Sequence, residues 1–328
     1  MDSNSVFSVQ VCEKECREIH EYASSRRLND LVPSLVRRNR YERKQIRETY
    51  LVMYGEDLIN HLQKTQSNHT NQKYSLLSLW MLEPHERDAV MARNALEDGD
   101  INYKALIEIY TGRKSSQILL INQAYQHKFK RQLDQDIISF EMSHPFQRIL
   151  VALATSHKSH NVDVSQHIAK CDAKRLYETG EGKGGSGGGG IEESVVLEMF
   201  SKRSIQQLRQ TFSTYKHIYG HEYSKSIKKD VYGDFEDALG IVVKCIYTPA
   251  KYYAKILHSC IKGTTTDKGA LGRVIVSRAE IDMDEIQRVF ENKYGIELKD
   301  AILCENMMIM DKPQRDFIVA LANIHYPS

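Results

Sequence analysis

The stretch IKGTTTDKGALGRVIVSRAEIDMDEIQRVF runs from Ile261 to Phe290 and joins a short polar loop to an amphipathic segment. The loop is rich in threonine and contains Gly263, and an acid, Glu305, follows 42 residues after that glycine. Hard cations such as Ca²⁺ take oxygen ligands, which loop carbonyls and a carboxylate both supply. The stretch therefore predicts a site for a hard cation between this loop and this acid.

The same stretch contains a spacing that recurs along the chain. Arg278 is followed by an aromatic residue after 12 positions, an apolar residue after a further 8 and another after a further 4. The four sets are Arg38, Tyr50, Leu58 and Leu62; Arg113, Tyr125, Leu133 and Ile137; Arg203, Tyr215, Tyr223 and Ile227; and Arg278, Phe290, Leu298 and Ile302. Identical spacing in four places indicates one structural unit repeated four times.

The apolar spacing within each repeat is helical. Apolar positions follow multiples of four with charged residues between them, and the alternation typical of strands is nearly absent. The sequence predicts an all-α fold with about five short helices per repeat. We expect a tail at residues 1–11, repeats at 12–84, 85–156, 169–247 and 248–328, and a connector at 157–168, in a two-plus-two arrangement joined near residues 155 to 168.

The composition is typical of a soluble globular protein. Charged residues make up 27% and hydrophobic residues 41%, and the net charge of +2 argues against nucleic acid as a partner. No apolar run approaches the ~18 to 20 residues of a membrane-spanning helix, and the first ten residues do not have the pattern of a secretory signal. The six cysteines have neither zinc-site nor disulfide-framework spacing. We therefore expect any contact with a membrane to be made from the water side.

Several motifs accompany the repeats. They are Lys262-Gly263-x-x-Thr266-Asp267, the run from Arg273 to Asp282, Pro84-x-Glu86-Arg87-Asp88-Ala89, Trp80, Asp172-Ala173-Lys174-x-Leu176-Tyr177-Glu178 and Val243-Lys244-Cys245. Together they resemble the annexin family over roughly residues 12 to 322, and its plant branch in particular. The resemblance implies a curved, all-helical disc of four repeats. It also implies a cytoplasmic, non-enzymatic protein that binds acidic phospholipid peripherally through Ca²⁺.

The family's calcium sites use three loop carbonyls and one distant acid, so each repeat can be checked in turn. The positions equivalent to Glu305 are Thr65, Phe140 and Asp230, so only repeats three and four keep a carboxylate. The loop from Ser24 to Asp30 has no glycine, and that from Leu96 to Asp100 is short. The metal ligands that the resemblance implies are Ile261, Gly263, Thr265 and Glu305 in repeat four, and Gly180, Lys183, Gly185 and Asp230 in repeat three.

Both retained loops depart from the family pattern. Thr265 replaces a second loop glycine, and Gly187 to Gly190 lengthen the loop of repeat three. Residues Gly180 to Gly185 also match G-x-G-x-x-G, but the segment before them is helical and no Gly-Lys-Ser/Thr follows, so a nucleotide site is not expected. We expect calcium affinity to be reduced in these two repeats.

A second hypothesis is an annexin-like helical scaffold that has largely lost calcium binding and acts through protein partners or calcium-independent lipid contact. A basic cluster would make that lipid contact in repeat one. Its members are Arg26, Arg27, Arg37, Arg38, Arg40, Arg43 and Lys44. Asp88 and Arg113 match the charged lining of a channel in the family, but a structural salt bridge is the preferred interpretation. The sequence names no protein partner and leaves homo-oligomerisation on membranes open.

Overall fold

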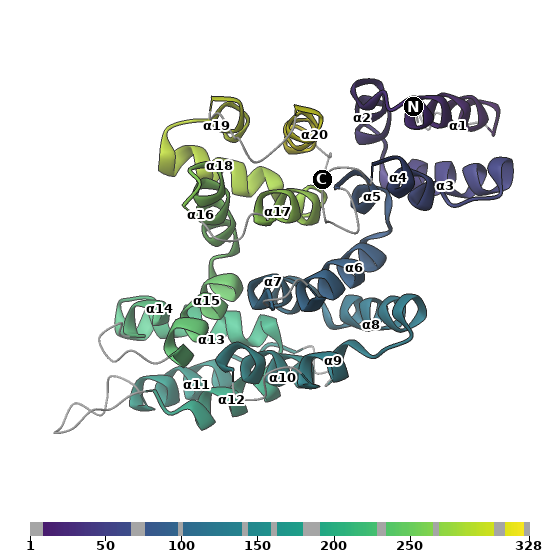
Figure 1. The fold of residues 1–328 in the computed structure, drawn as a ribbon. Helices are drawn as coiled ribbons and strands as arrows, with labels where there is room; N and C mark the ends of the chain where they lie inside the picture. The colour runs from purple at the N-terminus through teal and green to yellow at the C-terminus, as the bar shows by residue number, and fades with distance from the viewer. Residues whose placement is uncertain are drawn as a thin grey trace, which may run out of the picture. The chain divides into compact units, whose positions relative to one another are not determined.

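The computed structural model describes residues 9–66, 76–97, 101–139, 144–158, 163–179, 191–227, 234–264, 269–304 and 312–324. Within these ranges the chain forms twenty α-helices and contains no β-strand (Figure 1). Five consecutive helices correspond to each repeat. The predicted all-α fold of four repeats with about five helices each is confirmed.

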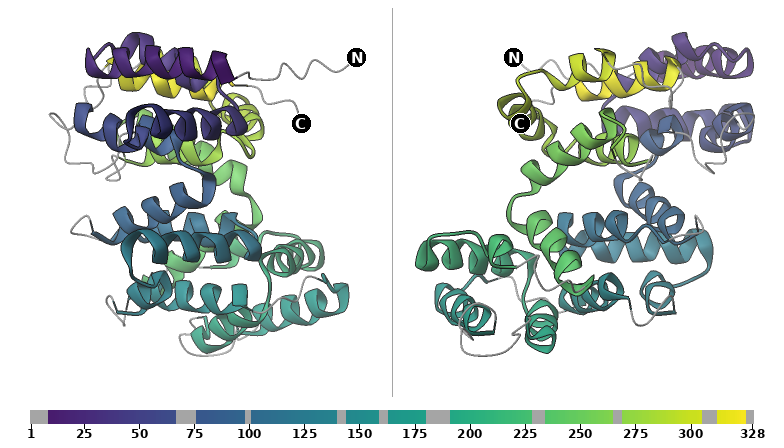
Figure 2. Two further views of the ribbon diagram at one scale, coloured as in Figure 1. Left: turned by 90° about the vertical axis from the view of Figure 1, so that its right-hand side faces the viewer. Right: turned by 60° about the vertical axis from the view of Figure 1, so that its left-hand side comes forward.

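The chain divides into two compact units, and each contains two repeats. The first unit comprises Met1–Arg87 and Tyr253–Ser328, and the second comprises Asp88–Tyr252. Helices from the two ends of the chain therefore belong to one unit, and α2 packs directly against α20 there (Figure 2). The two-plus-two arrangement is confirmed, with repeat one beside repeat four and repeat two beside repeat three.

The first unit is built from the helices of repeats one and four. They are α1 (Val9–Ser24), α2 (Leu28–Val36), α3 (Arg40–Tyr54), α4 (Leu58–Gln66), α5 (Leu76–Met81), α16 (Pro249–Ile261), α17 (Ala270–Arg278), α18 (Met283–Tyr294), α19 (Leu298–Cys304) and α20 (Lys312–Ala322). The boundaries between the units fall inside α16 and inside α6 (Pro84–Glu97), whose residues up to Arg87 belong to the first unit. The fully buried Leu31, Trp80 and Phe317 contribute to its core from α2, α5 and α20.

The second unit is built from the helices of repeats two and three. They are α6 (Pro84–Glu97), α7 (Tyr103–Gly112), α8 (Ser115–Phe129), α9 (Leu133–Ser139), α10 (Pro145–Lys158), α11 (Gln166–Thr179), α12 (Glu193–Lys202), α13 (Ile205–Tyr219), α14 (Tyr223–Ser226) and α15 (Asp234–Tyr247). The expected joint near residues 155 to 168 is wrong, because this segment lies inside the unit. The buried face of α10, which includes Ile149 and Leu153, is covered by α12 and α15, so repeats two and three share a core.

The recurring arginine has a structural role in each repeat. Arg38, Arg113 and Arg203 each pair with a carboxylate on the first helix of their own repeat, Glu15, Asp88 and Asp172. Arg278 differs, because its Nε donates to Asp282 Oδ1 at 2.7 Å and its guanidinium lies 4.8 Å from the ring centroid of Tyr253. The arginine therefore ties the end of the second helix to the first helix, by an ion pair in three copies and by a cation–π contact in the fourth.

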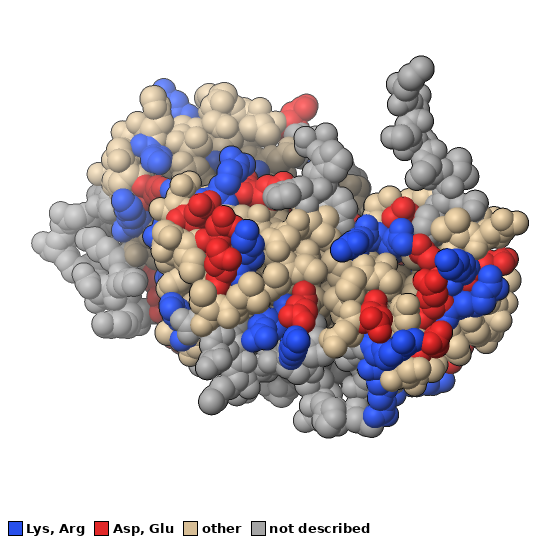
Figure 3. Space-filling view, turned by 90° about the horizontal axis from the view of Figure 1, so that it is seen from above, with Lys and Arg blue, Asp and Glu red and all other residues tan. Residues whose placement is uncertain are grey.

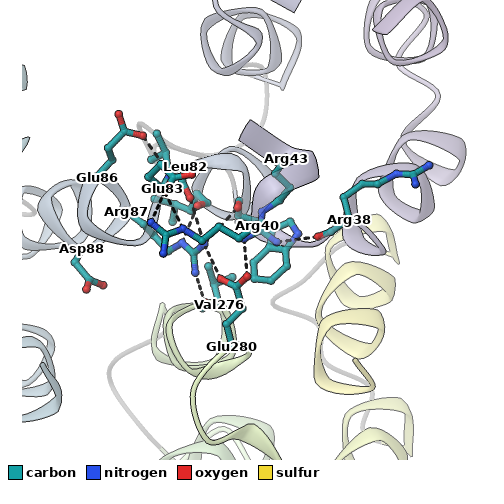
Figure 4. Close-up of polar contacts among 12 residues, drawn as sticks. Arg38, Arg40, Arg43, Leu82, Glu83, Glu86, Arg87, Asp88, Val276 and Glu280 are labelled. Carbon is teal, nitrogen blue, oxygen red and sulfur yellow. Dashed lines mark hydrogen bonds and ion pairs between the residues drawn. The ribbon is translucent and has the colours of Figure 1, made fainter. Parts of the chain in front are cut away.

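A buried cluster joins repeats one and four in the first unit (Figure 4). The guanidinium of Arg43 lies 3.9 Å from the ring centroid of Trp80 and that of Arg87 lies 5.1 Å from it. Glu280 accepts from Arg43 Nη2 at 2.7 Å and pairs with Arg87 at 3.5 Å. Arg87 Nη1 also donates to the carbonyl of Val276 at 2.8 Å. One carboxylate and backbone carbonyls thus compensate two buried cations, which would be costly without partners.

Candidate calcium and membrane site

The loop of repeat four begins with a well-defined turn at the end of α16. Gly263 has a φ of +66°, in the left-handed region that favours glycine. The amide of Thr264 donates to the carbonyl of Ser259 at 2.9 Å, and that of Gly263 donates to the carbonyl of Cys260 at 3.1 Å. These two bonds form a Schellman motif, which ends the helix and reverses the direction of the backbone.

The turn fixes the two predicted ligands that lie within the described residues. The side chain of Ile261 is 5% exposed and anchors the end of α16 in the core, whereas Gly263 is exposed to solvent. The bonds of the turn use the carbonyls of Ser259 and Cys260 rather than those of Ile261 and Gly263. The other predicted ligands, Thr265, Glu305, Gly180, Lys183, Gly185 and Asp230, lie outside the described residues.

Repeat one contains the same turn without a glycine. The amide of Arg27 donates to the carbonyl of Tyr22 at 2.8 Å, and that of Arg26 donates to the carbonyl of Ala23 at 3.1 Å. Arg26 has a φ of +56°, so it occupies the position that Gly263 occupies in repeat four. Sequence reasoning missed this equivalence because it required a glycine. Counting back from the end of the buried face of the first helix, at Ala23, would have aligned the two turns.

Repeat two stacks three rings where α7 begins. Tyr103, at the start of α7, stacks on His144 with ring centroids 4.2 Å apart and an interplanar angle of 12°. Phe146 lies nearly parallel to both rings, at 5.9 Å from Tyr103 and 5.8 Å from His144. The amide of Phe146 donates to His144 Nδ1 at 3.3 Å. Phe140, at the predicted position of the acid, lies outside the described residues.

Comparison with known proteins identifies the family. A sequence profile described as Annexin matches residues 87–153, 172–241 and 252–306, more than half of the chain. The chain belongs to the annexin family. Annexin A1 from Mus musculus is 35% identical over 276 residues, covering 84% of this chain and 77% of that protein. Annexin-like protein RJ4 from Fragaria ananassa is 30% identical over 272 residues, covering 83% of each chain.

Solved structures agree with this assignment. The structure of annexin III superposes with a TM-score of 0.80 at 30% identity and covers 98% of this chain and 96% of that one. Calcium-bound annexin (Sm)1 superposes with a TM-score of 0.76 at 21% identity, covering 99% and 93%, which supports the fold alone. Annexins are generally non-enzymatic proteins that bind acidic phospholipid membranes peripherally and in a calcium-dependent manner. None of the helices described in this annexin has the length and apolar character needed to cross a bilayer.

The basic cluster expected in repeat one is largely neutralised by neighbouring acids. Five of its seven members form ion pairs: Arg27 with Glu21, Arg38 with Glu15, Arg40 with Glu83, Arg43 with Glu280, and Lys44 with Glu48. Arg26 and Arg37 are exposed and form no ion pair with any residue that the structure describes. Among the coloured residues of Figure 3, basic and acidic side chains lie interspersed. Of the seven members of the basic cluster, Arg26 and Arg37 are therefore the two whose charge stays available for a calcium-independent lipid contact.

The charged residues matched to a channel lining in annexins form a buried pair. Arg113 Nε donates to Asp88 Oδ2 at 2.5 Å and Arg113 Nη2 donates to Asp88 Oδ1 at 3.0 Å. Arg113 is 8% exposed and Asp88 is 2% exposed. Glu108 accepts a hydrogen bond from the hydroxyl of Tyr252 at 3.2 Å. The bidentate geometry and the burial favour the structural salt bridge, because a buried charge persists when it is paired.

Proposed function

We propose that this annexin binds acidic phospholipid membranes through Ca²⁺ held only by repeats three and four. The observation that carries the proposal is the Schellman turn at Gly263, whose φ of +66° exposes a loop backbone at the end of α16. Ca²⁺ takes six to eight oxygen ligands at about 2.3–2.6 Å and accepts backbone carbonyls readily. A turn that fixes Gly263 and Thr264 before the metal arrives lowers the entropic cost of binding.

In repeat four, the carbonyls of Ile261, Gly263 and Thr265 would supply one side of the coordination shell and the carboxylate of Glu305 the other. Water and a lipid phosphate would complete it. The metal then bridges protein and membrane, so the small net charge of +2 is no obstacle to binding an anionic surface. Thr265 is β-branched and resists left-handed backbone angles, which lowers the expected affinity.

In repeat three, Gly180, Lys183, Gly185 and Asp230 would play the same parts. The adjacent helix end is well packed, because Tyr177 stacks on Tyr219 with ring centroids 4.1 Å apart. The glycine-rich sequence after it carries a large entropic cost when it becomes ordered around a metal. We expect repeat three to bind Ca²⁺ more weakly than repeat four.

Repeats one and two would contribute no calcium site. In repeat one, the cation Arg26 stands at the position of Gly263, where it would repel a divalent metal. In repeat two, Phe140 stands at the position of the acid, and the rings of Tyr103, His144 and Phe146 stack at the start of α7. Both repeats then complete the two units without holding Ca²⁺.

Vesicle co-sedimentation tests the proposal. Wild-type protein should pellet with phosphatidylserine vesicles when Ca²⁺ is present, and Glu305→Gln should shift the calcium requirement upward by about tenfold or more, because a charged metal ligand is lost. Asp230→Asn should produce a smaller shift. The matched control is Glu291→Gln, an exposed acid on α18, which should behave like wild type. Calcium-independent pelleting, or identical behaviour of all four proteins, contradicts the proposal.

A further inference from the structure

Arg26 lies in an unusual backbone conformation at an exposed position. Its φ of +56° belongs to the left-handed region, which glycine adopts freely and arginine adopts with strain. One other residue in the described ranges that is not glycine, Lys130, has a positive φ. Because strained residues often belong to functional sites, the exposed side chain of Arg26 is a candidate for a binding contact.

The neighbours of Arg26 hold the turn and are engaged with one another. Arg27 donates to Glu21 at 2.5 Å, and its guanidinium lies 4.8 Å from the ring centroid of Tyr22. Asp30 and Glu21, the acids nearest to Arg26 in sequence on either side, both pair with Arg27. Arg26 itself forms no ion pair with any residue in the described part of the chain. Among the described residues, Arg26 is therefore the cation of this turn that has no ion-pair partner, since both acids lie against Arg27.

The position of this charge matters because the turn is the counterpart of the one at Gly263. Both turns follow the first helix of their repeat and contain the same pair of backbone hydrogen bonds. In the proposed function, the turn of repeat four holds a cation next to a lipid phosphate. Repeat one has a guanidinium attached to the chain at the corresponding point.

We propose that Arg26 replaces the calcium ion in repeat one and binds the phosphate group of an anionic phospholipid without metal. The inference rests on the proposed function, because it requires that this turn meets the membrane as the turn of repeat four does. A guanidinium suits this role, since its planar fork donates two parallel hydrogen bonds to phosphate oxygens and stays charged at any physiological pH. The site would keep the protein loosely associated with anionic membranes when calcium is low.

Two substitutions elsewhere provide matched controls. Arg37 is also exposed and unpaired within the described residues, but it follows the last residue of α2, about 13 Å from the start of that helix. Arg37→Glu therefore makes the same change of charge at the opposite end. Lys130→Gly relieves the same kind of strain and removes the same charge in the second unit.

The test is sedimentation with phosphatidylserine vesicles in chelator at low ionic strength, where screening is weak. Arg26→Gly should weaken binding about fivefold and Arg26→Glu about 30-fold, at about 1 kcal/mol per charge. Arg37→Glu and Lys130→Gly should stay within about twofold of wild type. Arg26→Gly should also raise the urea midpoint, because glycine relieves the strain. Loss of binding in a more stable protein separates a lipid contact from damage to the fold.

The inference is wrong if the wild type does not bind vesicles in chelator, or if both Arg26 variants bind as well as the wild type. It is also wrong if Arg37→Glu loses as much binding as Arg26→Glu, because that result would indicate an effect of net charge. Repeating the assay with Ca²⁺ separates the two proposals. The Arg26 variants should still pellet in a calcium-dependent manner. If no protein does so, including the wild type, the proposed function is wrong. Inorganic phosphate, compared with chloride at matched ionic strength, distinguishes the source of the phosphate. Displacement of the vesicles indicates free phosphate at Arg26, and retention indicates the lipid headgroup.

Discussion

At the scale of single residues, the aromatic residue of the third helix is buried in different ways in repeats two, three and four. The buried Tyr125 donates its hydroxyl hydrogen to Asp136 at 2.6 Å, and Tyr215 hydrogen-bonds Ser226 at 2.9 Å, with each partner 11 residues later. In repeat four the aromatic residue is Phe290, and the residue 11 positions later is Ala301. Repeat four therefore lacks both the hydroxyl and its polar partner, as expected because an unpaired buried hydroxyl is costly. This pairing was visible in the sequence once the repeats were aligned.

Lys130 provides a prediction about backbone strain. The residues that follow the third helices are Gly55, Lys130, Gly220 and Gly295, all with φ between +57° and +78°. Lys130→Gly should raise the free energy of unfolding by about 1 kcal/mol, because the left-handed conformation is strained for lysine. Urea unfolding measures the change. Gly220→Ala is the opposite substitution and should lower stability by a similar amount; stabilisation by both would contradict the argument.

His157 provides a prediction about pH. Its Nε2 donates to the carbonyl of Tyr110 at 2.7 Å, and Ser115 Oγ lies 3.1 Å from its Nδ1. Burial lowers the pKa of His157 below its usual value, so the folded state binds fewer protons than the unfolded state. The contribution of His157 to stability should therefore be fully present well above about pH 6.5 and be lost as the pH falls below it. Burial also lowers the pKa values of His61 and His258.

The measurement is urea unfolding at about pH 7.5 and about pH 5.5, on either side of the ordinary histidine pKa. Wild-type protein should be less stable at the lower pH, and His157→Gln should lose less stability between the two values. The matched control is His127→Gln, at an exposed histidine on α8. Equal pH dependence in wild type and His157→Gln would contradict the role of this histidine.

At the scale of helices, close packing of α5 and α17 holds part of the first unit together. A Cβ added at Gly272 would lie 2.6 Å from Leu76 Cδ2, so the two helices approach through a residue without a side chain. Gly272→Ala should destabilise the protein by about 1–3 kcal/mol, because the leucine must move. In the double variant, Leu76→Ala should restore part of the free energy of unfolding that Gly272→Ala removes. Urea unfolding of the two single variants and the double variant measures the coupling energy between the two positions. Additive effects would contradict direct contact between these residues.

The sequence predicted the helices better than their ends. Spacing in the four repeats was sufficient for the fold class, because apolar periodicity depends on the buried faces that every repeat must keep. It could not predict the turn at Arg26, because helix ends are set by backbone hydrogen bonds that non-glycine residues also make at a cost. It also could not predict which cations of repeat one are paired, since Glu83 and Glu280 lie far from Arg40 and Arg43 in sequence.

At the scale of the whole molecule, the division into units follows contacts between distant segments. Repeat one joins repeat four through residues such as Arg43 and Glu280, which are 237 positions apart. Local periodicity carries no information about such pairs, so the expected joint near residues 155 to 168 was wrong. The candidate ligands Ile261 and Gly263 are placed by the turn of α16. The distant acids remain predictions from the alignment of the repeats.

The most direct test of the central claim is the amount of Ca²⁺ bound per chain on phosphatidylserine vesicles, measured by equilibrium dialysis. The comparison is between wild type, the double variant Glu305→Gln with Asp230→Asn, and the control Glu291→Gln. We predict that the wild type and the control bind Ca²⁺ equally and that the double variant loses nearly all of it, because Thr65 and Phe140 stand at the equivalent acid positions in repeats one and two. Undiminished binding by the double variant would contradict the assignment of the calcium sites to repeats three and four.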